Sequence, residues 1–429
     1  MSEKIGFIQK VKSTFSTHTL LFFLVFLYLL VFHILGGYLA FLFQLDFLIV
    51  FPYVFYYYYI KHYANIYFDK AFFNRLKIIF VSLMILNILS VFYGLLLTNY
   101  PTSIVGLALS FHYFTMFVYI LFGAILAVNY KKLNIILIIE IFSISLISLC
   151  LLEYFDVGFA NKLKVFYNVY EEMELSNDPN KYRIVGTLKN SNNLGLMMAF
   201  LLFLTWFNQG NRVIKTLISI GAVAVVFFSG SRTGFVLLVF VSIFYILNSW
   251  SLRNVTVLIA IIIGLFIVST FYIDYEKTVL YRRLMNTEVE SMFYTRQVFY
   301  WNDAIEAIKE SPILGVGRSE DLKNTVDNFY LNIMKTNGIV GLFLWLYFLS
   351  IIGFNAVKNY FSFIEAKLLV GIIGLMLLSS MTADFYFSRL FYPLFMIVIG
   401  YYSNLLILKA EEKNKTEKEI KIAYSDKLQ

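Results

Sequence analysis

Long uninterrupted runs of apolar residues dominate the hydrophobic pattern of this chain. Twelve runs have about the 17 to 25 residues that an α-helix needs to cross a lipid bilayer. The predicted spans cover residues 19–37, 39–60, 76–98, 102–128, 133–152, 190–207, 213–229, 233–249, 254–272, 337–357, 364–383 and 390–408. The pattern therefore predicts an all-α polytopic membrane protein with about 12 transmembrane helices.

The composition agrees with this prediction. Hydrophobic residues make up 60% of the chain and charged residues 14%, with a mean hydropathy of +0.74. Soluble proteins have about 45–50% apolar and about 25% charged residues, so the apolar surplus cannot be hidden in a soluble core. This excludes a cytosolic enzyme, a nucleic-acid-binding domain and a secreted disulfide scaffold. Cys150 is the single cysteine, and all four histidines precede residue 113, so we expect no metal and no cofactor.

Lysine and arginine in the short connections predict which side of each helix faces the cytoplasm. With a cytoplasmic N-terminus, fourteen of them lie in inner connections, whereas the short outer connections hold only Arg232 and Arg389. We therefore predict that both termini are cytoplasmic. The resulting parts are helices 1–5 (1–152), a first outer loop (153–189), helices 6–9 (190–272), a large outer loop between helices 9 and 10 (273–336), helices 10–12 (337–408) and a charged, solvated tail (409–429).

Arginine is distributed against this inside bias. Only eight of the 25 lysines lie outside, but seven of the ten arginines do. These arginines are Arg183, Arg232, Arg282, Arg283, Arg296, Arg318 and Arg389. Guanidinium is planar, always charged and able to bind phosphate oxygens through two hydrogen bonds at once. The distribution favours an anionic ligand at the outer surface, such as a lipid-linked diphosphate. The alternative is headgroup anchoring and pairing with acids of the loops.

Arg232 lies deepest, in a short outer turn between two apolar helices, Phe228-Ser-Gly-Ser-Arg-Thr-Gly234. A charge at this depth is costly, and it is normally paired or functional. The glycines permit a tight turn, and the N–H groups at the start of the next helix offer contacts to an anion. Asp46 and Glu140 lie inside spans that contain no counterpart charge, which indicates either an ion path or a position near the interface.

Three stretches carry a resemblance to the O-antigen polymerase and ligase superfamily of bacterial envelope polysaccharide assembly. The first is Arg183-Ile-Val-Gly186 with Asn190-Ser-Asn-Asn193-Leu-Gly195, and the second is the turn at Arg232. The third comprises Arg296-x4-Trp301, Pro312-Ile-Leu-Gly315-Val-Gly317, Asp327-Asn328-Phe-Tyr330-Leu and Gly338-Ile-Val-Gly341-Leu. The resemblance covers about residues 180 to 345. It implies a glycosyltransferase of the cytoplasmic membrane that acts at its periplasmic or outer face.

One departure from the ligases bears on the type of enzyme. The ligases have a histidine in an H-x10-G pattern at the end of the large loop, and in this chain that register holds Asp327 and Gly338. The resemblance therefore favours a polymerase of O-antigen, capsule or exopolysaccharide units. A ligase that uses a carboxylate remains the alternative within the family.

The expected substrate is an oligosaccharide linked to undecaprenyl diphosphate. We assign Arg232 and Arg296 to the diphosphate and Asp327 to the acceptor hydroxyl as base or orienting group, because the reaction needs a stabilised leaving group and a proton acceptor. Asp327-Asn328 is equally a helix N-cap signal. Further contacts to diphosphate or sugar are predicted for Arg183, Arg318, Arg282, Arg283, Asn193 and Trp301, with packing inside the loop as the alternative for Trp301.

Other protein classes fit the pattern less well. A flippase or other transporter usually shows internal repeats and broken helices with midplane polar residues. This chain shows no evident repeat and has five prolines. A sensor that uses the large loop for binding explains the arginines less directly. The expected partners are membrane lipid, a chain-length regulator and a flippase, without nucleic acid.

Overall fold

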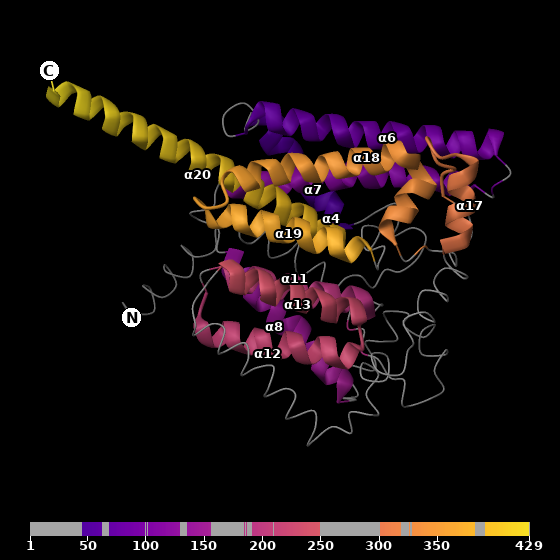
Figure 1. Cartoon of the computed structure of the whole chain (residues 1–429), viewed down its shortest axis with the longest axis horizontal. Helices are drawn as coiled ribbons and strands as arrows, with labels where there is room; N and C mark the ends of the chain where they lie inside the picture. The colour runs from indigo at the N-terminus through magenta and orange to yellow at the C-terminus, as the bar shows by residue number, and fades with distance from the viewer. Residues whose placement is uncertain are drawn as a thin grey trace.

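A computed structural model describes part of the chain. The described residues are 45–61, 68–98, 100, 102–128, 135–155, 184, 186, 191–208, 210–248, 301–318, 326, 328–381 and 391–428. All regular elements within these ranges are helices (Figure 1). They are α4 (Leu45–Phe55), the π-helix η1 (Tyr56–Ile60), α6 (Lys70–Leu97), the 3₁₀-helix η2 (Ile104–Leu107), α7 (Ala108–Val128), α8 (Ile135–Tyr154), α11 (Ser191–Phe207), α12 (Arg212–Ser229), α13 (Arg232–Asn248), α17 (Asn302–Glu310), α18 (Phe329–Lys358), α19 (Ile364–Ser380) and α20 (Phe391–Leu428).

The helices agree with the predicted all-α membrane architecture. Six of the described helices are long and apolar enough to cross a membrane: α6, α7, α8, α12, α18 and α20. Every predicted span that falls on described residues coincides with a helix. The spans predicted at 19–37 and 254–272 lie outside the described residues.

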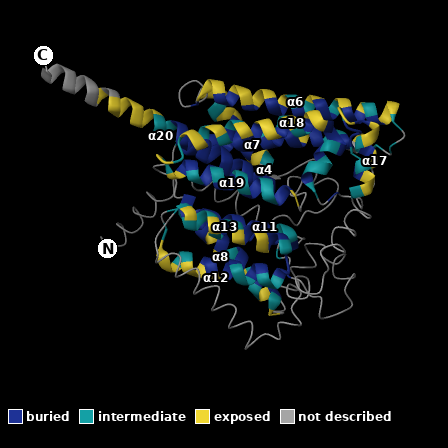
Figure 2. Cartoon of the chain, viewed as in Figure 1, coloured by how far each residue is buried: buried dark blue, intermediate teal, exposed yellow. Residues whose placement is uncertain are grey.

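Exposed apolar side chains confirm an integral membrane protein. One face of α6 presents an unbroken apolar stripe at helical spacing: Ile78, Val81, Ile85, Leu89, Phe92 and Leu96. The opposite face of α6 is buried against the bundle (Figure 2). A helix that is apolar on both its inner and outer faces is stable only when its outer face meets lipid.

The helices form two groups. One contains α6, α7, α18, α19 and α20, and the other contains α8, α11, α12 and α13 (Figure 1). In the first group, α7 and α20 cross at two glycines: a Cβ atom on Gly123 would lie 2.0 Å from the carbonyl oxygen of Ile397, and one on Gly400 2.0 Å from that of Ile120. Small residues permit such close backbone contact, which is the usual way in which membrane helices associate.

Helix α11 joins the two groups through aromatic contacts. The rings of Phe200 on α11 and Phe395 on α20 stack with centroids 4.0 Å apart. Phe203, one turn further along α11, packs so closely on α19 that a Cβ atom on Gly371 would lie 2.1 Å from its ring. These contacts hold the second group against α19 and α20.

Two boundaries differ from the sequence prediction. Helix α18 begins at Phe329 rather than at residue 337, because the Asn328 side chain accepts a hydrogen bond from the backbone N–H of Leu331 and caps the helix. Helix α20 continues to Leu428, so the charged tail is helical, and its residues 411–417 are exposed as predicted.

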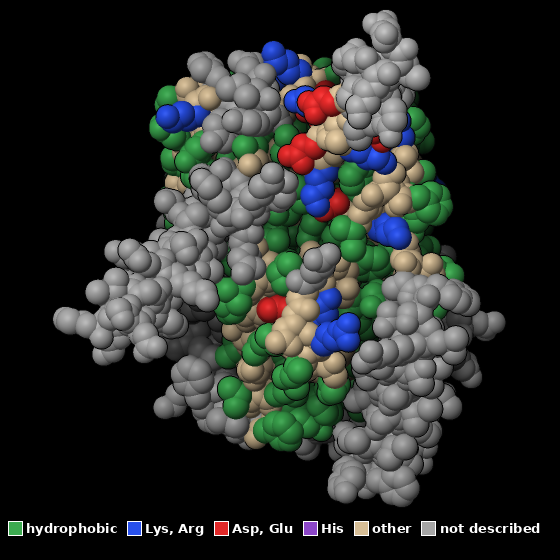
Figure 3. Space-filling model, turned by 90° about the vertical axis from the view of Figure 1, so that its left-hand side faces the viewer, with side chains coloured by type: hydrophobic (Ala, Val, Ile, Leu, Met, Phe, Trp, Pro, Cys, Tyr) green, Lys and Arg blue, Asp and Glu red, His purple; other side chains and the backbone are tan. Residues whose placement is uncertain are grey.

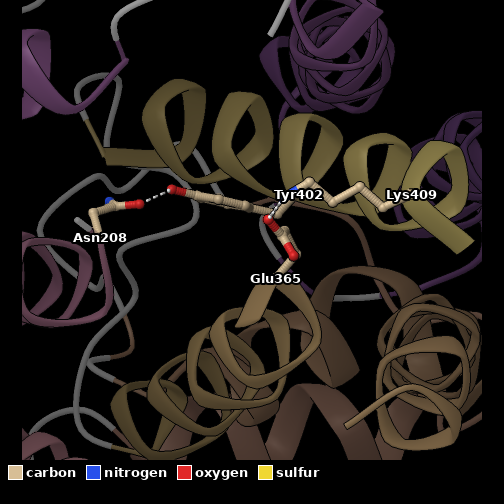
Figure 4. A network of polar contacts seen from close by, with 4 residues as sticks. All are labelled: Asn208, Glu365, Tyr402 and Lys409. Atoms are coloured by element: carbon tan, nitrogen blue, oxygen red, sulfur yellow. Dashed lines mark hydrogen bonds and ion pairs between the residues drawn. The ribbon is translucent and has the colours of Figure 1, made fainter. Parts of the chain in front are cut away.

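A polar network fixes one end of the bundle, which we call the tail end because α20 leaves the bundle there (Figure 4). The Tyr402 hydroxyl on α20 donates a 2.9 Å hydrogen bond to Asn208, just beyond α11. On the same helix, Lys409 pairs with the buried Glu365 of α19 at 2.5 Å. The network therefore ties α20 to both helix groups.

Glu140 also has a partner at this end. Lys215 on α12 attracts its carboxylate, and the backbone N–H of Asn211 donates a hydrogen bond to it. The span of Glu140 holds no counterpart charge, as the sequence indicated, and the counterpart lies on a different helix.

Candidate functional site

The predicted turn around Arg232 is a tight connection between α12 and α13. Gly230 adopts a left-handed conformation with φ of 60°, which glycine permits without strain. The backbone N–H of Gly234 donates a 3.0 Å hydrogen bond to the Ser231 hydroxyl, so Ser231 caps α13. Arg232 is the first residue of this helix and is half-buried. Because a cation is unfavourable at the positive N-terminus of a helix, helix stability does not explain an arginine here.

The structure brings the Asn-rich stretch to this turn. The Ser231 hydroxyl donates a 3.2 Å hydrogen bond to Asn192 Oδ1 on the first turn of α11. Gly195 and Gly234 face each other so closely that a Cβ atom on Gly234 would lie 2.6 Å from the Cα atom of Gly195. Both glycines therefore serve the crossing of α11 and α13. Asn193 is half-buried on the same turn of α11, close to the start of α13.

A second group of motif residues comes together where the segment Pro312–Gly317, which we call the inserted segment, packs into a break in α18. Gly338 interrupts the helix with φ of 64° and ψ of −170°. The backbone N–H of Ile339 donates to the carbonyl of Pro312 at 2.9 Å, and that of Val316 donates to the carbonyl of Lys335 at 2.8 Å. The inserted segment thus satisfies backbone groups that the break leaves without helical partners. Two glycine motifs that are separate in the sequence form one structural unit.

The inserted segment is also fixed on its other side, where it meets the end of α6 and the start of η2. The Thr102 hydroxyl donates a 2.6 Å hydrogen bond to the carbonyl of Val316. The backbone N–H of Ser103 donates a 2.9 Å hydrogen bond to the carbonyl of Arg318. The Ser90 hydroxyl donates to the carbonyl of Leu314. These contacts hold Arg318 half-buried at the end of a rigid segment.

The Arg232 turn and the inserted segment lie at the same end of the bundle, which we call the turn end. Asn328 at the start of α18 donates a hydrogen bond to the carbonyl of Met381 at the end of α19. The end of α11 and the start of α19 both lie at the tail end, since Asn208 accepts a hydrogen bond from Tyr402 and Glu365 pairs with Lys409 on α20. The start of α11 therefore lies at the same end as the start of α18. Helix α17 is seen at the right of Figure 1 and the C-terminus at the far left.

Lys335 is a turn-end residue that the sequence reasoning missed. Its side chain is on α18, three residues before Gly338, and the residue is only 4% exposed. Its ammonium nitrogen lies 5.0 Å from the centroid of the Tyr100 ring. The available signal was a single lysine within the otherwise uncharged stretch 329–338.

Acidic residues surround Tyr100 on the solvent side. Burial, together with the carboxylates of Asp303, Glu310 and Glu306 on α17, raises the pKa of Tyr100 to about 12. The phenol therefore keeps its proton at neutral pH and can donate a hydrogen bond. Asp303, Glu306 and Glu310 are all exposed.

Several predicted site residues lie outside the described residues: Arg183, Arg282, Arg283, Arg296 and Asp327. The N-cap predicted from Asp327-Asn328 is present, and Asn328 provides it. Trp301 is half-buried and immediately precedes α17. Gly186 of the first motif is described and has φ of 54°, and its backbone N–H donates to Glu153 on α8 at 2.8 Å.

A cleft of about 800 Å³ lies at the tail end, remote from these motifs. It is formed by α6, α18 and α20, and its lining includes Arg75, Lys358 and Glu411 but no predicted site residue. Figure 3 shows this end of the molecule, where basic and acidic side chains are mixed. The sequence motifs and the cleft thus lie at opposite ends of the bundle, and a cleft alone assigns no reaction.

A comparison with known protein families gives a match that includes parts of the turn end. Residues 217–346 match the family model described as O-antigen ligase. The region is similar to this family. The matched residues include the Arg232 turn, Trp301, the inserted segment, Arg318 and the first part of α18. The match supports a membrane enzyme that transfers glycans, of the ligase or polymerase kind. No curated protein matches the chain.

Proposed function

We propose that the protein is a polysaccharide polymerase that joins oligosaccharide units carried on undecaprenyl diphosphate. In this proposal it resides in the bacterial cytoplasmic membrane, and the turn end faces the periplasm or cell exterior. The reaction needs no metal. The product is a chain of O-antigen, capsule or exopolysaccharide units.

The proposed step is a displacement at the anomeric carbon of the donor sugar. The acceptor hydroxyl oxygen forms the new bond, the bond from the anomeric carbon to the phosphate oxygen breaks, and the diphosphate leaves with the electron pair. The hydroxyl proton passes to the Asp327 carboxylate. Arg232 and Arg296 bind the diphosphate and stabilise the charge that develops on it.

The position of Arg232 is the observation that carries this proposal. A half-buried guanidinium stands at the N-terminus of α13, where both the cation and the helix dipole attract an anion. Ser231, Asn192 and the paired glycines fix the backbone around it. Such a preorganised cation stabilises a leaving diphosphate without rearranging during the reaction.

The remaining predicted residues hold the substrates. Arg183, Arg282, Arg283 and Arg318 contact diphosphate or sugar, Asn193 hydrogen-bonds the donor beside the turn, and Trp301 stacks on a sugar ring. A flippase delivers the substrate, and a chain-length regulator limits the product.

A ligase is the second candidate, because the matching family model is described as O-antigen ligase. A deletion strain distinguishes the two on a polysaccharide gel. Loss of a polymerase leaves single repeat units on the acceptor and removes the ladder of longer chains, whereas loss of a ligase removes both from the acceptor. Loss of a flippase leaves the units on the cytoplasmic side. An unchanged ladder contradicts all three activities.

A further inference from the structure

Lys335 is a buried cation without a neutralising contact. The residue is 4% exposed, and within the described part of the chain its ammonium group makes no ion pair and no hydrogen bond. Its one close contact is the face of the Tyr100 ring at 5.0 Å. Arg318 lies close enough to repel it, and Asp303 attracts it from the exposed face of α17.

These surroundings destabilise the folded protein. Removing an ammonium group from water is unfavourable unless hydrogen bonds or an opposite charge replace the lost hydration. A cation–π contact with a single ring recovers only part of this cost. The attraction of Asp303 is weakened because that carboxylate is exposed to solvent. Packing and folding therefore do not explain a lysine at this position.

Lys335, Arg318 and Tyr100 each present a hydrogen-bond donor here, whereas the carboxylates of α17 are exposed to solvent. Lys335 contributes an ammonium group and Arg318 a guanidinium group, and Tyr100 keeps its phenolic proton. The inserted segment holds Arg318 in place, and its bond from Val316 to the carbonyl of Lys335 fixes the backbone beneath the lysine. Two cations and a neutral donor are complementary to a group with several anionic oxygen atoms.

We infer that Lys335 and Arg318, beside Tyr100, form a second anion-binding site that takes the phosphate or diphosphate group of a lipid-linked substrate. The site is built on α18 and the inserted segment, whereas Arg232 begins α13 in the other helix group. The inference rests on the proposed function, because a polymerase must hold two lipid-linked substrates at once. One diphosphate binds at Arg232 and the other at Lys335.

Binding to the purified full-length protein in detergent tests the inference. The probes are inorganic diphosphate, undecaprenyl diphosphate and vesicles of phosphatidylglycerol. Lys335→Met removes the charge at nearly constant side-chain length. Lys358→Met, at the exposed far end of α18, is the matched control.

We expect two sites for undecaprenyl diphosphate in the wild type and in the control, and one in Lys335→Met. Inorganic diphosphate should bind the Lys335 site about 10- to 100-fold more weakly in that variant.

Stability provides an independent readout. Because the lysine is buried at a cost, Lys335→Met should melt at the same temperature as the wild type or higher. A lower melting temperature together with unchanged diphosphate binding would assign Lys335 a structural role and overturn the inference. Lys335→Arg keeps the charge and should keep measurable binding, and complete loss of binding in this variant would also contradict a charge-based site.

The probes separate the possible sources of the anion. Binding of phosphatidylglycerol vesicles that depends on Lys335, without any effect on either diphosphate, would make this a phospholipid site and overturn the substrate assignment. The proposed function is tested separately by the deletion strain. Diphosphate binding at Lys335 in a protein whose deletion leaves the ladder intact would refute the polymerase and retain the anion site. If the deletion removes the ladder but Lys335→Met still binds two diphosphates, the polymerase is supported and the anion site at Lys335 is refuted.

Discussion

Lys409 and Lys335 lie at opposite ends of the bundle, and their surroundings differ. At the tail end, Lys409 pairs with the buried Glu365 at 2.5 Å, next to the bond from Tyr402 to Asn208. At the turn end, Lys335 is 4% exposed, and within the described residues its ammonium group makes no ion pair and lies 5.0 Å from the centroid of the Tyr100 ring. The tail end uses buried charge to connect helices. At the turn end, we assign Lys335 to the binding of an anion, at a cost in stability.

The glycines at the turn end also differ in their role from those inside the bundle. At the turn end, Gly338 breaks a helix so that a loop segment can insert, and Gly230 turns the chain directly before Ser231 and Arg232. Within the bundle, Gly123 and Gly400 only bring two regular helices together. The irregular backbone is concentrated where the proposed chemistry takes place. Substitutions at the two ends should therefore affect different properties.

Arg232→Ala should have the largest effect on activity. Removal of the guanidinium group should slow chain extension by about 100- to 1,000-fold, as expected for loss of a preorganised charge-stabilising group. Arg232→Lys should recover little, because lysine cannot bind two phosphate oxygens in the planar geometry of arginine. Polymer length on gels, normalised to the amount of protein in the membrane, measures the effect. Wild-type chains from the Ala variant would remove Arg232 from the site.

Asp327→Asn should reduce activity and leave the fold intact. Loss of a general base slows a reaction by about 100-fold or more, and helix α18 keeps its cap because Asn328 provides it. Asn328→Ala is the matched control. It should lower stability by about 1 kcal/mol and retain most of the activity. Chain extension and melting temperature are measured for both variants, and full activity of Asp327→Asn would refute the base assignment.

Gly338→Ala should disturb the turn end through its backbone. A Cβ atom would lie 2.0 Å from the carbonyl oxygen of Ile313, in a backbone region that is essentially restricted to glycine. We expect a destabilisation of at least about 3 kcal/mol and loss of activity. Gly353→Ala, later in the same helix, meets its nearest atom at 3.4 Å and should be tolerated. Unfolding in mixed detergent micelles compares the two, and equal stability would mean that the insertion does not form.

Lys409→Met should lower stability without lowering specific activity. The variant leaves the buried Glu365 carboxylate without its counterion, which we expect to cost about 2 kcal/mol because Lys409 itself is partly exposed. Adding Glu365→Gln should restore most of the loss. Lys413→Met removes the exposed pair with Glu417 and a distant contact with the Phe363 ring, and should cost less than about 0.5 kcal/mol. A clear loss of specific activity in folded Lys409→Met would contradict the proposed difference between the two ends.

The sequence predicted several elements of the candidate site. The apolar runs located the helices on both sides of Arg232, and the glycines around it indicated a tight turn, which the structure confirms. The proximity of Asn192 to Ser231 was not predictable, because it depends on the contact of Gly195 with Gly234 across two helices. Lys335 was overlooked for the same reason. Its burial results from α17, the inserted segment and the region of Tyr100 packing around α18.

The sequence by itself determined that this is a helical membrane protein and where most helices run, because transfer of a segment into lipid depends on the sum of its own side chains. It also located the candidate motifs. Only the tertiary structure decided that α18 breaks at Gly338, that Asn328 rather than Asp327 caps it, and which buried charges have partners. These properties arise from hydrogen bonds and electrostatic contacts between segments far apart in the chain, and no local pattern of residues determines them.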